Sequence, residues 1–169
     1  MARLRLERYS FRFAEQVLNA RLATKQELEL ILIDASIEIE KLSRPSFNAT
    51  LDKLFVARGW ERQPPVFDDP GDPSAKMDFL KDRVGVEVGF GHSSFLGIDL
   101  LKFQVASYSA MDKIDVGVYV TTTRAFQRRL QAEFGQNWDG SLSYEKVCRY
   151  LPYSKSAIRV PIYVVGIDC

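Results

Sequence analysis

The stretch 76-KMDFLKDRVGVEVGFGHSSFLGIDLLK-102 decides the fold of this chain. Within it, residues 84–90 alternate between apolar side chains and Gly85, Glu87 and Gly89, which is the pattern of a β-strand. Glu87 is therefore expected on a thin, open face of the strand, because its neighbours there have no side chains. A glycine inside a strand weakens it unless something approaches the backbone closely, and a phosphate backbone is one candidate.

A second strand is expected directly before this one. Asp78 lies in the short apolar segment 77–80, and the polar residues 81–83 predict the turn of a hairpin that brings Asp78 and Glu87 close together. Neighbouring carboxylates repel each other, and a shared proton or a divalent cation relieves the repulsion. Oxygen ligands favour magnesium or manganese over zinc. The alternative is that both carboxylates are solvated charges on an exposed sheet face.

Length and composition bound the class of protein. The 169 residues predict one domain, residues 1–169, that buries about two thirds of the surface of its unfolded chain. The net charge of +1 means that nucleic-acid binding would depend on a local basic patch. Cys148 and Cys169 are too few and too badly spaced for a zinc site or a disulfide framework, which favours a reducing compartment.

Several partners are not expected. No apolar run approaches the roughly 18 residues of a membrane span, and the first residues lack the apolar segment of a signal peptide. We therefore predict no membrane partner and a cytoplasmic location. Neither GxGxxG nor GxxxxGK[ST] occurs, so no nucleotide cofactor is implied.

Two helices are expected before the hairpin. A capping box at residues 24–27 predicts a helix that continues to about residue 43. Pro45 breaks this helix, and Ser46 can cap a second one. Residues 60–74 contain four prolines and one glycine, which predicts a loop that holds no regular element.

Helix and strand patterns alternate after the hairpin. A mostly apolar helix at 95–111 precedes a short apolar strand at 114–121, so this strand is expected to run parallel to the strand at 84–90. The closing strand at 157–167 contains Pro161, which predicts an edge position or a bulge. Further helices are expected at 124–134 and 144–150. We therefore predict an α/β fold with a mixed sheet of about five or six strands flanked by α-helices.

The sequence also resembles a known family. Residues 87–104, EVGFGHSSFLGIDLLKFQ, together with the preceding Asp78, are similar to the core of the BglII-like type II restriction endonucleases, within the PD-(D/E)XK nuclease superfamily. The segments YSFRFAEQVLN, DKIDVGVYVTTT and IRVPIYVVGI stand in the order that the family shows. The resemblance covers most of the chain and implies a restriction-endonuclease-like fold.

The resemblance assigns the chemistry to a few residues. It implies that Asp78, Glu87 and the carbonyl of Val88 bind Mg²⁺ and that Asp78 and Glu87 are catalytic. Two positions after the glutamate the superfamily usually has lysine, and this chain has Gly89. One implication is that Lys102 or His92 takes over the role of this lysine, and we assign Lys102 as the catalytic residue. The alternative is that the chain cuts DNA slowly or not at all.

The resemblance further implies double-stranded DNA as the partner and hydrolysis at a short palindromic site. A homodimer is expected, because an enzyme that cuts both strands of a palindrome mirrors the two-fold symmetry of the DNA. Two alternatives remain: an inactive DNA-binding protein of the same fold, and a nuclease used in repair. The loops expected to reach base edges supply six DNA-binding candidates: His92, Ser93, Ser94, Asn137, Asp139 and Ser141.

Overall fold

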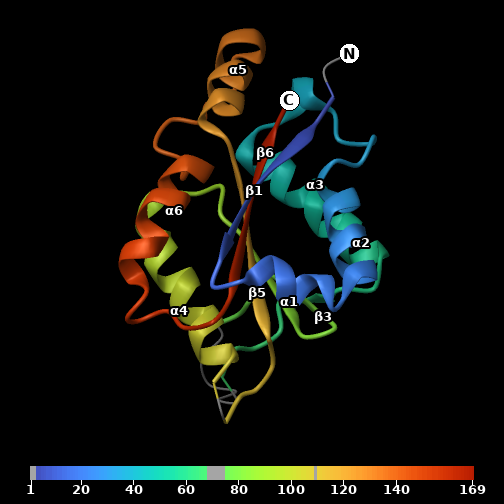
Figure 1. Cartoon of the computed structure of the whole chain (residues 1–169). Coiled ribbons are helices and arrows are strands. Elements are labelled where there is room, and N and C mark those ends of the chain that lie inside the picture. Colours follow the sequence, from blue (N-terminus) through green and yellow to red (C-terminus); the bar gives the residue numbers. More distant parts are fainter. Residues whose placement is uncertain (1–2, 68–74, 109) are drawn as a thin grey trace.

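A six-stranded mixed sheet forms the centre of the molecule (Figure 1). The computed structural model describes residues 3–67, 75–108 and 110–169. The strand order is β1-β6-β5-β4-β3-β2; β4, β5 and β6 are parallel, and the other neighbours are antiparallel. This confirms the predicted mixed sheet. The strands are β1 (Arg5–Phe11), β2 (Glu61–Arg62), β3 (Phe79–Lys81), β4 (Val84–Val88), β5 (Val116–Thr122) and β6 (Ile162–Asp168).

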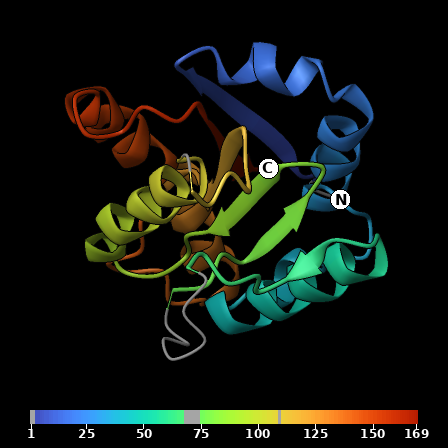
Figure 2. The same cartoon turned by 90° about the horizontal axis from the view of Figure 1, so that it is seen from below.

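Helices cover both faces of the sheet, as Figures 1 and 2 show. On one face α4 (Leu96–Ala106) and α6 (Tyr144–Tyr150) pack over one hydrophobic cluster, and on the other α2 (Leu22–Leu32) and α3 (Arg44–Ala57) pack over a second. Side chains of β5 and β6 alternate between the two clusters, so both faces of these strands are buried. The remaining helical segments are α1 (Ala14–Asn19), η1 (Ile39–Lys41), η2 (Ser93–Phe95), α5 (Arg124–Phe134) and η3 (Leu151–Ser154).

The predicted hairpin is present between β3 and β4. Asp82 and Arg83 form its two-residue turn with φ of 49° and 63°. Two left-handed residues give such a turn the twist that matches the flanking strands. The helix α4 connects β4 to the parallel strand β5, as expected for a βαβ unit.

The predicted capping box is wrong. The helix α2 begins at Leu22, so Thr24 and Glu27 lie inside it. The Thr24 hydroxyl donates to Asp82 Oδ2 at 2.5 Å, and Glu27 Oε1 accepts a hydrogen bond from Trp60 Nε1 at 2.9 Å. Both side chains therefore bind partners that are distant in the sequence instead of capping the backbone.

Three other boundaries also differ from the expectation. The first long helix ends at Leu32, because Asp34 Oδ1 accepts the Ser36 N–H and forms a turn. Ser43, and not Ser46, caps α3, with its hydroxyl accepting the Ser46 N–H. The proline-rich loop contains the short strand β2; its residues 68–74 lie outside the described part of the chain.

The closing strand lies inside the sheet, between β1 and β5, and not at an edge. Pro161 comes directly before β6, where its missing N–H does not interrupt the strand pairing. Among the described residues, none of the helices has the length and apolar character needed to cross a membrane.

Candidate active site

The hairpin brings Asp78 and Glu87 to one pocket at the carboxyl end of β4. The strand β3 begins at Phe79, two residues later than the expected strand at 77–80, so Asp78 directly precedes it; Glu87 lies inside β4. The Val88 N–H donates to Asp78 Oδ2 at 2.7 Å, which turns the carboxylate of Asp78 toward β4. Both carboxylates and Val88 line a cavity of about 250 Å³.

The face that bears Glu87 is covered, so the prediction of an open face was wrong. Glu87 is 3% exposed. Gly85 makes room for the side chain of Met77, and Gly89 makes room for Tyr119: a Cβ at residue 89 would lie 2.6 Å from Tyr119 Cζ and closer still to its hydroxyl. The glycines therefore accommodate protein side chains, and not a phosphate backbone.

Lys102 reaches this pocket from α4. Its Nζ donates to Glu87 Oε1 at 2.9 Å and to the carbonyl of Lys76 at 3.1 Å, and it lies 3.0 Å from Asp99 Oδ1. The other oxygen of Asp99 accepts the Tyr119 hydroxyl at 3.0 Å. The structure thus places an amine beside Glu87 although residue 89 has no side chain.

The electrostatics of the pocket favour a cation. Burial, and then repulsion from Asp78 and Asp99, raises the pKa of Glu87 to about 9. Burial also raises the pKa of Asp78. Burial opposes the charge on Lys102, but the carboxylates of Glu87 and Asp99 outweigh it and raise the pKa of this amine. Three carboxyl groups lie around one ammonium group, and the raised pKa means that Glu87 binds a proton more readily than an ordinary glutamate.

The two loops predicted to contact DNA lie side by side at the same edge of the sheet. His92 and Ser141 form a β-bridge, and the Leu142 N–H donates to the Gly91 carbonyl at 2.8 Å. His92 also lines the cavity of Asp78 and Glu87. The six candidates differ in availability: His92, Ser94, Asn137 and Asp139 are exposed, whereas Ser93 and Ser141 are half-buried and accept hydrogen bonds from Lys146 and Arg44.

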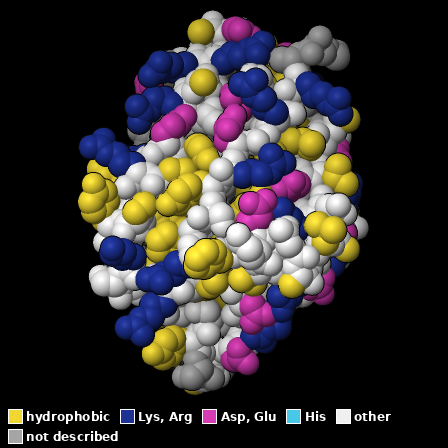
Figure 3. Space-filling view, viewed as in Figure 1, with side chains coloured by type: hydrophobic (Ala, Val, Ile, Leu, Met, Phe, Trp, Pro, Cys, Tyr) yellow, Lys and Arg dark blue, Asp and Glu magenta, His cyan; other side chains and the backbone are white. Residues whose placement is uncertain are grey.

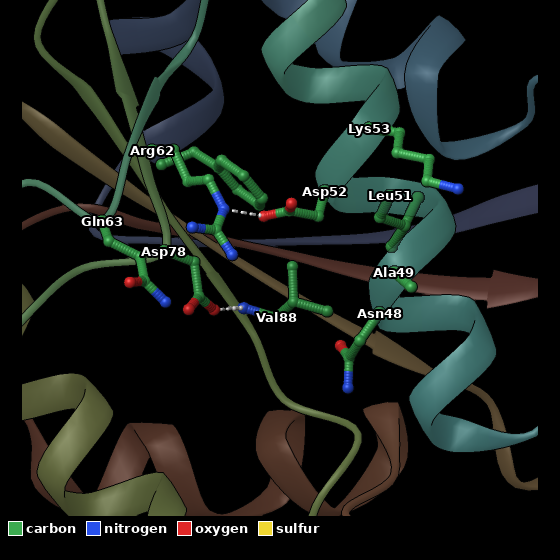
Figure 4. A pocket seen from close by; sticks show the side chains of 10 residues that line it. Asn48, Ala49, Leu51, Asp52, Lys53, Arg62, Gln63, Asp78 and Val88 are labelled. Carbon is green, nitrogen blue, oxygen red and sulfur yellow. Dashed lines mark hydrogen bonds and ion pairs between the residues drawn. The ribbon is translucent and has the colours of Figure 1, made fainter.

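A second cavity, of about 440 Å³, opens on the other side of Asp78, toward α3 (Figure 4). Arg62 Nε donates to Asp52 Oδ1 at 2.5 Å across this cavity, and the Gln63 N–H donates to the carbonyl of Asp78 at 2.8 Å. Asn48 and Asp52 stand one turn apart on α3, a spacing visible in the sequence. Sequence reasoning missed the cavity because β2, which places Arg62 opposite Asp52 on α3, was not expected.

Gly89→Ala is expected to lower the free energy of unfolding by about 1–3 kcal/mol, because the new methyl group would displace the buried ring of Tyr119. The thermal midpoint should fall by a few degrees. Gly97→Ala is the matched control: Gly97 lies on α4, and apart from its chain neighbours and the backbone of its own helix no described residue comes within 4 Å of a Cβ there, so the midpoint of this variant should stay the same or rise slightly. Equal midpoints for Gly89→Ala and the wild type would contradict the packing seen here.

Comparisons with known proteins bear on the family and the fold of the chain. The family model described as restriction endonuclease BglII/BglIII matches residues 6–167. The crystal structure of restriction endonuclease BglII complexed with a DNA 16-mer superposes with a TM-score of 0.69 at 20% identity, covering 96% of this chain and 75% of that one. The crystal structure of free BglII gives a TM-score of 0.65 at 20% identity, covering 96% and 78%. No curated protein sequence matches significantly. The superpositions confirm the predicted fold.

Proposed function

Because the chain belongs to the restriction endonuclease BglII/BglIII family, we propose that it is a magnesium-dependent enzyme that hydrolyses phosphodiester bonds at a short palindromic site in duplex DNA. Family membership makes it a type II restriction endonuclease acting on DNA; the metal ion, the palindrome and the dimer are the parts that we propose. Its substrate suggests that it works in the cytoplasm. The main support is the pocket of Asp78 and Glu87, which opens beside the two adjoining loops.

The residues of the pocket suit a hard divalent cation. Among the described residues, no three His, Cys, Asp or Glu side chains are arranged as a metal site. The proposed ligands are therefore the carboxylates of Asp78 and Glu87 and the carbonyl of Val88, all of them oxygen donors of the kind that Mg²⁺ prefers. The raised pKa of Glu87 supports the assignment, since a cation would compensate the crowded negative charge. When bound, the ion supplies charge that polarises the scissile phosphate and acidifies the attacking water.

The side chains of the protein supply the rest of the chemistry. The ammonium of Lys102 is directed at Glu87 Oε1 and can stabilise the charge that develops on the phosphate during cleavage. Glu87 can hold a proton on its carboxylate until the cation displaces it, so metal binding should strengthen as the pH rises. The exposed side chains of the adjoining loops would contact base edges. We assign the cavity lined by Lys53, Arg62 and Gln63 to the phosphate backbone of the cleaved strand.

A homodimer is part of this proposal, and one surface suits it. Phe95 at the end of η2 is 60% exposed, Ile98 and Leu101 on α4 are 53% and 49% exposed, and Tyr150 at the end of α6 is 49% exposed. In Figure 3 hydrophobic side chains gather over α6, with lysine and arginine side chains around them. Contiguous apolar side chains on a surface favour association with another protein. We assign this face to a second copy of the chain.

Ile98→Glu is expected to weaken dimerisation at least about tenfold, because it would bury an unpaired charge in the proposed interface. Analytical ultracentrifugation over a concentration series measures this change. Leu30→Glu is the control: Leu30 is similarly exposed, at 56%, but lies on α2, across the sheet. A wild-type chain that stays monomeric at high concentration, with and without DNA, would contradict the assignment.

The experiment that tests the function is plasmid cleavage with Mg²⁺ and with EDTA, followed by sequencing of the product ends. Discrete fragments that require the metal and share one terminal sequence would support a restriction endonuclease and identify its site. Tight duplex binding without cleavage would favour the inactive DNA-binding protein, for which the missing lysine at Gly89 is the reason. Cleavage of flaps or single strands in preference to duplex DNA would favour the repair nuclease.

A further inference from the structure

Asp99 is a buried carboxylate that the proposed metal site does not use. It is 9% exposed and lies on α4, one turn before Lys102. Its Oδ1 lies 3.0 Å from Lys102 Nζ, and its Oδ2 accepts the Tyr119 hydroxyl at 3.0 Å. Burial of a carboxylate is costly unless its oxygens are paired. Each oxygen of Asp99 has a partner, and one of these partners is the amine of the candidate active site.

Lys102 needs such a partner because a lysine side chain is long and flexible. Its four-carbon stem has many rotamers, and a charged amine stabilises a transition state only when it is held in place. Two of its three acceptors, Glu87 and the Lys76 carbonyl, lie around the β3–β4 hairpin. A cation or substrate at Glu87 would compete for the first of them. Asp99 shares the helix with Lys102 and lies outside the proposed ligand set, so it can hold the amine throughout.

Tyr119 connects Asp99 to an inner strand of the sheet. It lies on β5, is fully buried, and pairs in register with Glu87 on β4. Its side chain extends over Gly89 to reach Asp99. A side chain at residue 89 would collide with the Tyr119 ring, so the tyrosine–aspartate hydrogen bond requires the glycine. The contacts therefore form a chain: Gly89 leaves room for Tyr119, Tyr119 donates to Asp99, and Asp99 pairs with Lys102. The amine of Lys102 reaches the pocket from the helix α4.

We propose that Asp99 and Tyr119 are positioning residues that hold the Lys102 ammonium beside Glu87 for DNA cleavage. The inference rests on the proposed nuclease function and extends it to two residues outside the metal site. They are expected to act through Lys102: both line the cavity of Asp78 and Glu87, but neither is a proposed ligand of the metal ion. Their removal should therefore lower the rate of cleavage without changing the affinity for DNA.

The test is a double-mutant cycle on single-turnover cleavage of the plasmid site. Asp99→Asn should slow cleavage about 100-fold, the loss expected when a reacting group shifts by about 1 Å. Tyr119→Phe should slow it about tenfold, through loss of one hydrogen bond to a charged group. In a Lys102→Met background both changes should alter the rate by less than about twofold, because the amine that Asp99 and Tyr119 position is absent. DNA affinity in EDTA should stay within about twofold of the wild type.

Two variants serve as matched controls. Asp168→Asn removes a buried carboxylate that is paired with Arg5, and Tyr163→Phe removes a buried tyrosine hydroxyl that donates to Glu29 at 2.9 Å. Neither should change the cleavage rate more than about twofold. If Asp99→Asn does not fold, as judged by circular dichroism, Tyr119→Phe alone decides the question.

The outcomes separate this inference from the function on which it rests. A wild-type chain that never cuts DNA overturns the proposed function and the positioning pair with it. A wild-type chain that cuts, with Asp99→Asn or Tyr119→Phe equally fast, overturns the positioning pair alone. Rate losses that multiply with that of Lys102→Met also overturn it, because they would show that Asp99 and Tyr119 act independently of the amine.

Discussion

Asp78→Asn should lower the rate of DNA cleavage at least about 1000-fold while leaving duplex affinity in EDTA within about threefold of the wild type. A cation that polarises a phosphate contributes several kcal/mol to the transition state, and each 1.36 kcal/mol is tenfold in rate. Asparagine removes the charge that would hold the cation. It keeps an oxygen that can accept the Val88 N–H, now bonded to Asp78 at 2.7 Å, so the hairpin should persist.

Single-turnover cleavage measures this loss, and Asp82→Asn is the control. Asp82 lies in the same hairpin, at the turn, with a φ of 49° that asparagine tolerates well. Its carboxylate accepts the Thr24 hydroxyl, and an amide oxygen can do the same. Cleavage by Asp78→Asn within tenfold of the wild-type rate would remove Asp78 from the proposed metal site.

Much of the fold was predictable because local patterns agreed with tertiary structure. The strict alternation of residues 84–90 and the polar turn before it gave the hairpin, and the helices at 124–134 and 144–150 have the observed bounds. Prediction failed where a distant partner competed with a local one. The sequence pattern predicted that Thr24 caps a helix, but its hydroxyl donates to Asp82, which is 58 residues away in the sequence. Two-residue strands such as β2 are too short to leave a pattern.

The two carboxylates of the candidate site were predictable from the sequence, but the residues that surround them were not. Spacing alone pointed to Asp78 and Glu87, because a hairpin places its own two strands side by side. Whether Glu87 faces solvent depends on Tyr119 and Lys102, which follow much later in the chain and lie on other elements. A glycine in the sequence, such as Gly89, does not reveal which side chain occupies the space beside its Cα. The roles of these residues in catalysis stay predictions.

Glu87→Gln should abolish cleavage and, in the absence of metal, stabilise the fold above neutral pH. The pKa of Glu87 is raised to about 9, first by burial and then by Asp78 and Asp99. In the unfolded chain a glutamate has a pKa of about 4.3. Between these values the folded protein binds a proton that the unfolded chain does not, so the free energy of unfolding falls as the pH rises. Glutamine does not titrate, and Lys102 keeps Asp99 as a partner.

Thermal unfolding in EDTA from pH 5.5 to 8.5 measures this effect. The midpoint of Glu87→Gln should exceed that of the wild type by at least about 3 °C at pH 8.5, roughly 1 kcal/mol, and the gap should narrow toward pH 5.5. Mg²⁺ should raise the midpoint of the wild type and leave that of Glu87→Gln nearly unchanged.

Glu29→Gln is the control of opposite sign. Burial opposes ionisation of Glu29, but hydrogen bonds from Arg8 and Tyr163 outweigh it and lower the pKa of this carboxyl group. The charge of Glu29 therefore stabilises the fold at pH values above the pKa of an ordinary glutamate. Its replacement should therefore lower the midpoint at pH 8.5. If Glu87→Gln also lowered the midpoint there, Glu87 would be ionised and fully matched by Lys102 without metal. The crowded carboxylates would then give no reason for a cation, and the assignment of the metal site would rest on family membership alone.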